Sequence, residues 1–218
     1  MPEYNARETR DCYNRTARQY AENFLHELDN KPLDRSLLDR FNDALPEASL
    51  IYDFGCGSGQ TTQYIHAKKR HKIIGLDFSE QAIQLAMQNF NEIEFMVDDI
   101  LNSKMAAGSA DGILAFYAIV HFTYREVEQA LREWLRLLKP GGFCLFCFHA
   151  GDEALEVTDF LGVSGANATW FFLDTDRVLA TAEHIGFRVE EAVVRYPYVG
   201  VEHESKRAYV WLKKPEQQ

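Results

Sequence analysis

The chain has 218 residues, a formal net charge of −10 and 46% hydrophobic residues. This length suits a single globular domain with a sizeable core. The negative charge, with no basic stripe to offset it, disfavours a nucleic-acid partner. Because no run of about eighteen apolar residues is present, no membrane span is expected. The polar, charged N-terminus also lacks the features of a signal peptide.

Two helices are predicted before the first strand. One face of the first helix carries residues spaced by four, three and four positions: Tyr13, Ala17, Tyr20 and Phe24. A second helix is predicted after Pro32, and its apolar face repeats at similar steps: Leu33, Leu37, Phe41 and Leu45. Such spacing is typical of helices that pack one side against a core.

A glycine-rich segment follows the first predicted strand. The apolar run 51–54 contains Asp53 and leads into glycines at every second position, 55, 57 and 59. We expect a buried strand, a tight loop and a helix that starts near Gln60. Since glycine has no Cβ, a ligand can touch the backbone of such a loop. The alternative is a strand–turn–helix joint without a ligand.

The glycine spacing distinguishes between classes of ligand. A dinucleotide fingerprint reads G-x-G-x-x-G, and its third glycine would stand where this chain has Gln60. The observed G-x-G-x-G pattern favours a nucleoside ligand that has no pyrophosphate. A nicotinamide-dependent oxidoreductase is therefore disfavoured.

Three further strands of a parallel sheet are predicted at 72–77, 94–100 and 111–116, with a fourth at 143–148 after Leu-Lys-Pro-Gly-Gly. Asp77 follows Asp53 by 77 − 53 = 24 residues, which is about the length of one βαβ unit. Helices predicted between the strands alternate with them, which indicates a parallel sheet covered on both faces.

The C-terminal part is predicted to contain a helix from Asp174 to Ile185 and two strands, Arg188 to Tyr196 and Lys206 to Lys213. Residues 151–169 lack clear periodicity, so we expect a long functional or mobile connection there.

Cysteine usage indicates no disulfide framework and no metal site. Cys144 and Cys147 are three residues apart in a strand, which places them on opposite faces of the sheet. Two side chains on opposite faces cannot bind one metal ion. Together with the N-terminal composition, this favours a reducing, cytoplasmic location.

Four motifs in this order resemble those of the class I S-adenosylmethionine (SAM)-dependent methyltransferases, in the type 11 or UbiE-like small-molecule branch. They are D-x-G-C-G-x-G, G-x-D-x-S, the acidic step at 98–99 and L-K-P-G-G. The resemblance implies an α/β, Rossmann-like, doubly wound and mostly parallel seven-stranded sheet with an antiparallel last strand and N-terminal cap helices. It divides the domain 1–218 into cap helices (1–46), a SAM-binding core (47–150), a variable acceptor-side segment (151–173) and a closing helix with a β-hairpin (174–218).

The resemblance also implies roles for individual residues on the cofactor side. Asp77 would accept hydrogen bonds from the ribose hydroxyls. Asp99 would face the adenine beside Ile100, and Asp98 is the alternative for that role. The residues expected on the cofactor side are Tyr13, Tyr20, Asp53, Gly55, Cys56, Gly57, Gly59, Asp77, Phe78, Asp98, Asp99, Ile100 and Phe116.

The methyl acceptor is less well defined by the sequence. His121 and His149 are candidate general bases, but His121 has an alternative role as a hydrogen-bonded residue beneath the site. Residues expected to line the acceptor side are Tyr117, His121, His149, Trp170, Arg195 and Tyr198, and packing in the core is the alternative for the aromatic run Trp170-Phe171-Phe172. The predicted activity is methyl transfer from SAM to a small molecule, which leaves S-adenosylhomocysteine (SAH). The alternative is a non-catalytic SAM-binding or nucleoside-binding sensor. Either would be a monomer or a homodimer.

Overall fold

The computed structural model of the protein describes residues 2–216. Its helices and strands, in chain order, are α1 (Ala6–Phe24), η1 (Glu27–Asn30), α2 (Pro32–Ala44), β1 (Leu50–Phe54), α3 (Gln60–His66), β2 (Lys72–Asp77), α4 (Glu80–Asn89), β3 (Glu94–Val97), β4 (Ala110–Phe116), α5 (Tyr124–Leu137), β5 (Leu138–Ala150), β6 (Ala154–Val157), η2 (Phe160–Gly162), β7 (Ala168–Phe171), α6 (Thr175–Ile185), β8 (Arg188–Arg195) and β9 (Lys206–Lys213).

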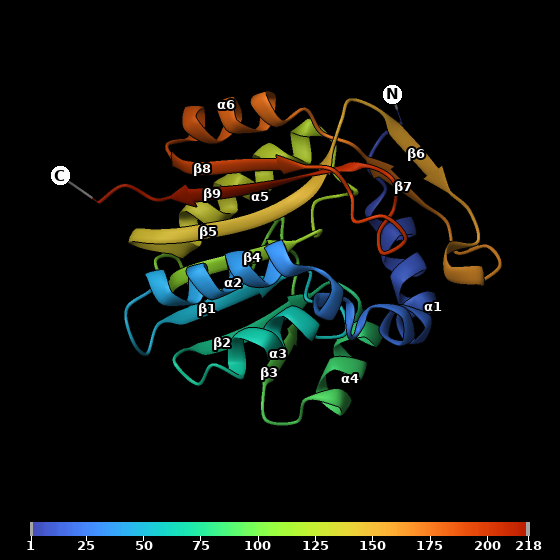
Figure 1. The fold of residues 1–218 in the computed structure, drawn as a ribbon, viewed down its shortest axis with the longest axis horizontal. Coiled ribbons are helices and arrows are strands. Elements are labelled where there is room, and N and C mark those ends of the chain that lie inside the picture. Colours follow the sequence, from blue (N-terminus) through green and yellow to red (C-terminus); the bar gives the residue numbers. More distant parts are fainter. Residues whose placement is uncertain (1, 217–218) are drawn as a thin grey trace.

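Seven strands form one twisted sheet in the order β3-β2-β1-β4-β5-β9-β8 (Figure 1). Within this sheet, β9 runs antiparallel to both of its neighbours, β5 and β8. The other neighbouring pairs are parallel. The predicted doubly wound sheet with an antiparallel last strand is therefore confirmed. Its strand order reverses at β1, between β2 and β4, and ligands of such sheets bind at this switch point.

Helices cover both faces of the sheet. On one face, Trp134 of α5 and Val178 of α6 belong to the main hydrophobic core. On the other face, Phe41 of α2 and Ile65 of α3 belong to a second buried cluster. Cys144 lies in the first cluster and Cys147 in the second, so the prediction that they lie on opposite faces is confirmed.

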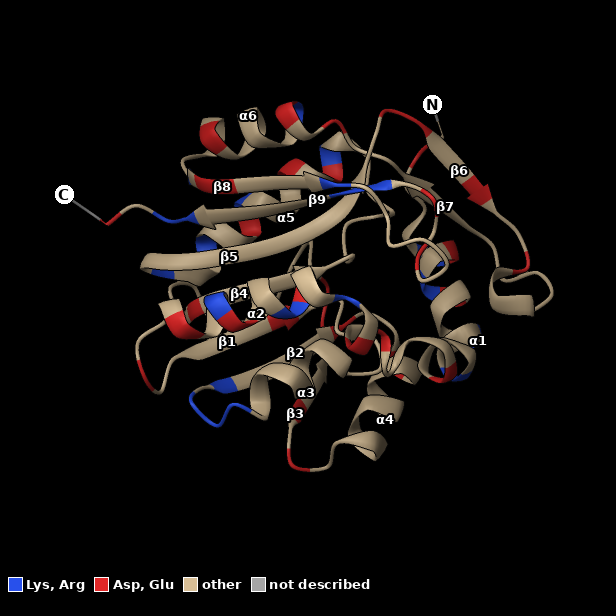
Figure 2. Ribbon diagram, viewed as in Figure 1, with Lys and Arg blue, Asp and Glu red and all other residues tan. Residues whose placement is uncertain are grey.

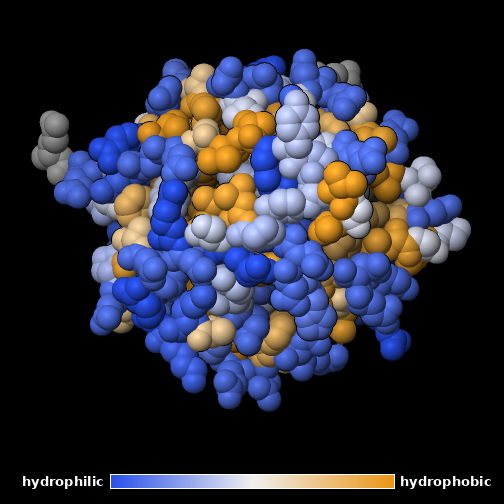
Figure 3. Space-filling model, viewed as in Figure 1, coloured by the Kyte–Doolittle hydropathy of each residue, from blue (hydrophilic) through white to orange (hydrophobic). Residues whose placement is uncertain are grey.

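The surface reflects this amphipathic packing. Acidic and basic positions are interspersed along the outer faces of the helices (Figure 2). The face drawn in Figure 3 is mainly hydrophilic and is interrupted by separate hydrophobic areas. None of the helices within residues 2–216 has both the length and the apolar character needed to cross a membrane.

Residues 151–169, which the sequence predicts as an irregular connection, contain β6 and the start of β7. β6 and β7 pair as a small antiparallel sheet, with Ala154 opposite Phe171 and Val157 opposite Ala168. The hairpin packs on α1, where Arg15 donates a 2.8 Å hydrogen bond to the Gly165 carbonyl. Each strand has only four residues, and neither alternates between buried and exposed side chains, so the sequence gives no strand pattern here.

One other difference concerns the length of a strand. The fifth strand extends from Leu138 to Ala150, because the predicted Leu-Lys-Pro-Gly-Gly turn is absorbed into an irregular start of β5. The cap helix α1 and the β6–β7 hairpin lie near the edge of the sheet where the parallel strands end (Figure 1). This arrangement closes the switch point from one side.

Candidate functional site

The glycine-rich loop joins β1 to α3 in the predicted position. Gly55, Gly57 and Gly59 all have positive φ, of 66°, 54° and 90°, a conformation that favours glycine. A Cβ on Gly55 would lie 2.5 Å from the Cβ of Ala118, so the backbone leaves no room there for a side chain. At Gly57 the nearest atom to such a Cβ would be in the Tyr20 ring, at 3.4 Å. The loop therefore exposes backbone to the space beneath α1.

Asp77 at the end of β2 organises this loop. Its Oδ2 accepts a 2.9 Å hydrogen bond from the Gly57 N–H, and its Oδ1 accepts a 2.8 Å bond from the Ser79 N–H. The residue is 8% exposed, and burial raises the pKa of its carboxyl while the backbone bonds counteract that rise. Each carboxylate oxygen can accept more than one hydrogen bond, so Asp77 retains capacity for a ligand.

The two acids after β3 have different environments. Asp98 is buried, accepts a hydrogen bond from the Ser103 hydroxyl, and accepts another from the Lys104 N–H at 3.1 Å. Asp99 is exposed, and its Oδ1 accepts a 2.9 Å bond from the Leu101 N–H. Asp98 therefore stabilises the turn, whereas Asp99 keeps one oxygen free for a ligand. This difference favours Asp99 over Asp98 for the adenine-facing role.

A cavity with an empty volume of about 680 Å³ lies at this edge of the sheet, and we call it the cofactor cavity. Most of the residues predicted on the cofactor side line it: Tyr13, Tyr20, Gly55, Gly57, Asp77, Phe78, Asp98, Asp99, Ile100 and Phe116. Residues of the same wall that sequence reasoning missed are Tyr4, Thr9, Ala118 and Phe122. They belong to no motif, and only the fold brings them together.

The remaining predicted cofactor residues lie outside this cavity. Asp53 and Cys56 line a smaller adjoining space. Asp53 is 1% exposed and accepts a 2.6 Å hydrogen bond from the Thr62 hydroxyl, and burial raises its pKa to about 7. Gly59 packs against the ring of Phe95, where an added Cβ would lie only 2.9 Å away. These three residues therefore support the glycine-rich loop on the side that faces away from the cofactor cavity.

A second large cavity adjoins the cofactor cavity, and we call it the acceptor cavity. Tyr13, Tyr20 and Tyr117 line both, so these three rings form the boundary between them. Other residues of the acceptor cavity come from η1 and the residue after it, β5, the β6–β7 hairpin, the loop before β9 and β9 itself: Glu27, Lys31, His149, Phe160, Trp170, Glu202, His203 and Arg207. Tyr117, His149 and Trp170 were predicted on the acceptor side.

His121 lies on the cofactor side of the boundary and is buried. A carbonyl can only accept, so its Nδ1 donates the 2.8 Å bond to the Thr169 oxygen. Its Nε2 then accepts the 2.9 Å hydrogen bond from the Tyr13 hydroxyl. Burial lowers the pKa of His121 to about 4, so the ring is neutral at pH 7. The Tyr13 hydroxyl covers Nε2, which favours the alternative in which His121 is hydrogen-bonded beneath the site.

His149 lies at the end of β5 in the wall of the acceptor cavity. Its Nδ1 lies 2.8 Å from the Ser205 hydroxyl, and its ring stacks on Trp170 with centroids 5.7 Å apart. Burial lowers the pKa of His149 to about 3, and the positive charge of Arg207 contributes to this effect. His149 is therefore also neutral at pH 7.

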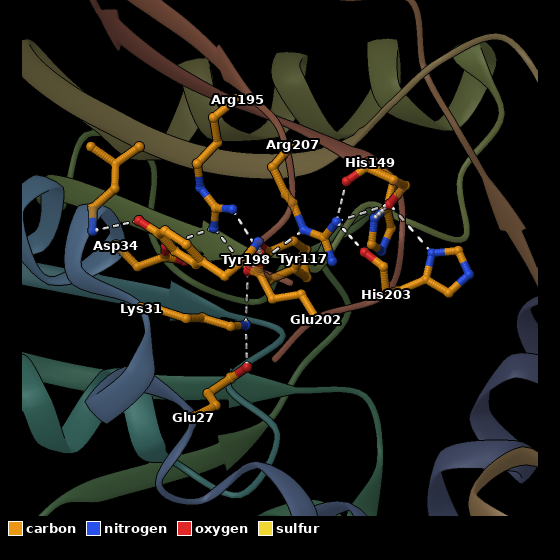
Figure 4. Close-up of polar contacts among 12 residues, drawn as sticks. Glu27, Lys31, Asp34, Tyr117, His149, Arg195, Tyr198, Glu202, His203 and Arg207 are labelled. Carbon is orange, nitrogen blue, oxygen red and sulfur yellow. Dashed lines mark hydrogen bonds and ion pairs between the residues drawn. The ribbon is translucent and has the colours of Figure 1, made fainter. Parts of the chain in front are cut away.

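Arg195 and Tyr198 do not line either cavity, which corrects the expectation that they would. Arg195 donates to both carboxylate oxygens of Glu202, at 2.7 and 2.8 Å (Figure 4). It also donates to the Tyr209 hydroxyl at 2.7 Å. The Tyr198 ring lies 4.1 Å from the guanidinium carbon of Arg195. Both side chains are held in a polar network behind the cavity, and Glu202 with Arg207 lines the wall instead.

Comparisons with known proteins agree with this geometry. Residues 51–142 match the family described as methyltransferase domain. The tRNA (carboxymethyluridine(34)-5-O)-methyltransferase ALKBH8 of Mus musculus is 32% identical over 114 residues, which cover 52% of this chain. The chain spans only 16% of the length of that relative. A 2-phytyl-1,4-naphtoquinone methyltransferase of Thermosynechococcus vestitus is 26% identical over 151 residues, or 67% of this chain and 62% of that protein.

A solved SAM-dependent methyltransferase from Methanosarcina mazei has the same fold, with a TM-score of 0.70 at 16% identity. The similarity covers 79% of this chain and 95% of that one. Residues 51–142 therefore match a methyltransferase domain, and the sheet order of the chain is that of the SAM-dependent methyltransferase fold.

Proposed function

We propose that the protein transfers the methyl group of SAM to a small molecule bound in the acceptor cavity, and that SAH is the second product. The observation that carries this proposal is the contact between the two cavities. Tyr13, Tyr20 and Tyr117 line both, so a cofactor on one side and an acceptor on the other would meet at these rings.

The residues of the cofactor cavity fit SAM. Gly55 and Gly57 leave backbone exposed where the amino-acid end of the cofactor would lie. Asp77 and Asp99 retain carboxylate oxygens that could accept hydrogen bonds from ribose hydroxyls and from the adenine amino group. Phe116 lies in the same wall and could contact the flat part of the nucleoside.

Bound SAM supplies an activated methyl group, so the protein's task is to align the acceptor and exclude water. Tyr117 supports this role because its φ of 56° is uncommon for a non-glycine residue and strained residues cluster at functional sites. Its ring lies at the boundary between the cavities, because Tyr117 lines both. His121 acts on the other side of the boundary as a positioning residue, because it fixes the hydroxyl of Tyr13.

A small acceptor is favoured over tRNA, the substrate named for the mouse relative. The chain carries a formal charge of −10, which disfavours association with a polyanion. The acceptor cavity is also lined by aromatic rings of Phe160 and Trp170, which suit a compact organic molecule. The second candidate, a SAM-binding sensor without turnover, would use the same cofactor cavity.

The test is SAH release in the presence of a panel of small metabolites, with unfractionated tRNA as a separate arm. Release that depends on a small molecule supports the proposal. SAH release with tRNA but with no small molecule would show that the acceptor is a tRNA and not a small molecule. Tight SAM binding without turnover in any arm would favour the sensor.

A further inference from the structure

His149 presents one ring nitrogen to the acceptor cavity. The residue is only 7% exposed, and it lines this cavity at the end of β5. Its Nδ1 lies 2.8 Å from the Ser205 hydroxyl, but within residues 2–216 no hydrogen bond joins its Nε2 to another residue. Nε2 is not fully enclosed by protein atoms either. Since the acceptor cavity is the space that His149 lines, its Nε2 is available to a ligand there.

The contacts of Ser205 indicate which nitrogen of His149 carries the proton. A guanidinium can only donate, so Arg207 Nη1 donates the 3.1 Å hydrogen bond to the Ser205 hydroxyl oxygen. The single hydroxyl proton faces two ring nitrogens, Nδ1 of His149 at 2.8 Å and Nδ1 of His203 at 3.4 Å. The shorter contact favours donation to His149. A neutral ring that accepts at Nδ1 carries its proton on Nε2. The group in the cavity wall is therefore an N–H donor.

The surroundings of His149 favour a hydrogen-bonding role over that of a general base. Burial and then the positive charge of Arg207 lower the pKa of His149 to about 3. Both residues appear in Figure 4, on the same side of the polar network. A general base works best when its pKa is near the operating pH. The neutral ring can donate from Nε2, but it is poorly suited to take a proton from a ligand.

The charged groups of the adjoining network neutralise one another. Lys31 pairs with Glu27 at 2.5 Å, and Glu202 lies 2.7 Å from Arg195 and 3.6 Å from Arg207. The network contains three cations and three carboxylates: Lys31, Arg195, Arg207, Glu27, Asp34 and Glu202. A charged ligand would add an uncompensated charge to a largely buried site, which is costly. The balance of charge therefore favours an uncharged ligand.

Aromatic rings surround His149 in the cavity wall. Its ring stacks on Trp170 with an interplanar angle of 16°, and the Tyr117 ring lies 5.6 Å away between centroids. Phe160 contacts Trp170 edge to face. Such a wall suits a flat, apolar body with a few polar atoms. Because Tyr117 also lines the cofactor cavity, a ligand held at His149 would lie close to the boundary that the methyl group must cross.

We propose that the acceptor cavity selects an uncharged, planar methyl acceptor that carries a hydrogen-bond-accepting oxygen, and that His149 is the specificity-determining residue that donates from Nε2 to this oxygen. This inference rests on the proposed function. The hydrogen bond orients the ligand, while the rings of Trp170 and Tyr117 contact its flat body.

The first experiment uses SAH-saturated protein and two neutral probes of nearly the same shape. Acetophenone has a carbonyl oxygen where α-methylstyrene has a CH₂ group, and ligand-observed NMR titration gives the affinity of each. Acetophenone should bind saturably. The ratio of the two affinities should fall at least about threefold in His149→Phe, because one neutral hydrogen bond is lost. Comparing ratios removes the difference in hydrophobicity between the probes. Benzoate and benzylamine, which are charged, should each bind at least about tenfold more weakly than acetophenone.

Two variants serve as controls. His149→Gln retains an amide N–H donor, so it should keep most of the wild-type ratio. His184→Phe removes an exposed histidine of α6 and should leave the ratio unchanged. SAH affinity, measured by calorimetry, reports the folding of each variant.

A second measurement needs no variant, so it decides the question even if His149→Phe does not fold. NMR of the wild-type protein with ¹⁵N-labelled histidine reports the protonation of each ring nitrogen. At pH 7 His149 should be neutral, with its proton on Nε2.

The inference is overturned by any of four results. These are failure of acetophenone to bind the SAH complex, tighter binding of either charged probe, a His149 proton on Nδ1, or an affinity ratio that is unchanged in folded His149→Phe or equally reduced in His149→Gln. Each would leave the proposed function intact. Failure of the wild-type protein to bind SAH would instead contradict the proposed function itself.

Discussion

The cofactor cavity and the acceptor cavity are built in different ways. The cofactor cavity uses backbone and carboxylates at the ends of β1, β2 and β3, where each functional residue lies within a few positions of a strand end. The acceptor cavity combines side chains from segments far apart in the chain, such as Lys31, His149 and Arg207. The first is determined by local motifs and the second by tertiary packing.

The chemistry of the two regions differs as well. Asp77 accepts hydrogen bonds from the backbone N–H groups of Gly57 in the glycine-rich loop and of Ser79 directly after β2. Glu202 instead binds cations from other elements, and its side chain is only 1% exposed. A change in the first region should mainly affect cofactor affinity, whereas a change in the second should mainly affect stability and acceptor recognition.

The largest effect is expected from Glu202→Ala. It removes the carboxylate shared by Arg195, Arg207 and Lys31, and leaves buried cations uncompensated. Breaking a buried ion network in this way costs about 3–5 kcal/mol of unfolding free energy. Urea denaturation measures the loss, and SAH affinity below the unfolding transition should be nearly unchanged. A loss below about 0.5 kcal/mol would mean that the network is not important for stability.

Asp77→Ala should produce the opposite pattern. We expect SAM affinity to fall at least about tenfold, because each hydrogen bond to a charged carboxylate contributes about 1.5–3 kcal/mol. The variant also leaves the Gly57 and Ser79 N–H groups without their acceptor, so stability should decrease modestly. Asp77→Asn, which keeps one acceptor oxygen, is the matched control and should lose less affinity. If Asp77→Ala and Glu202→Ala lost comparable SAM affinity, the expected difference between the cofactor region and the acceptor region would be contradicted.

The pH dependence of stability should reveal His121 at the boundary. Its folded pKa of about 4 lies below the ordinary value of 6.5, so the folded state binds fewer protons than the unfolded state between these values. The stabilisation is fully present above pH 6.5 and is lost as the pH falls toward 4. Between pH 7 and pH 5 we expect a loss of about 1–2 kcal/mol from this group.

His121→Gln isolates this contribution, because other titrating groups remain in both proteins. Asp53 is one of them, and its raised pKa of about 7 has the opposite sign, since its contribution decreases as the pH rises. The difference in unfolding free energy between wild type and His121→Gln should therefore shrink from pH 7 to pH 5. A constant difference would show that His121 does not titrate in this range.

The smallest effect is expected from Tyr13→Phe. It removes only the hydroxyl that donates to His121 Nε2, which should cost about 0.5–1.5 kcal/mol. Thermal unfolding measures this cost. Hydrogen exchange in α1 and in the β6–β7 hairpin should become faster if this bond helps to hold the cap, and unchanged exchange would argue against that role.

The sequence predicted the cofactor side better than the acceptor side for a physical reason. The loop glycines and Asp77 follow directly from strand ends and backbone requirements, which are local. The β6–β7 hairpin gives no periodic pattern, because its strands have only four residues. Its position on α1 depends on long-range contacts such as that of Arg15 with Gly165.

The sequence also could not show which of two arginines, Arg195 or Arg207, lines the acceptor cavity. Arg195 and Arg207 lie opposite each other in the β8–β9 register, and nothing local distinguishes them. Only the fold shows that Glu202 and Asp34 neutralise Arg195, whereas Arg207 faces the acceptor cavity. The sequence also did not predict that Lys31 lines the acceptor cavity, because this residue precedes α2 and belongs to no motif.

The central claim, that SAM binds in the cofactor cavity against Asp77, is tested most directly by calorimetric titration of SAM into wild type and Asp77→Ala. We predict saturable binding to the wild-type protein and an affinity at least about tenfold lower for the folded variant. A folded Asp77→Ala protein that binds SAM as tightly as wild type would contradict the assignment of this cavity.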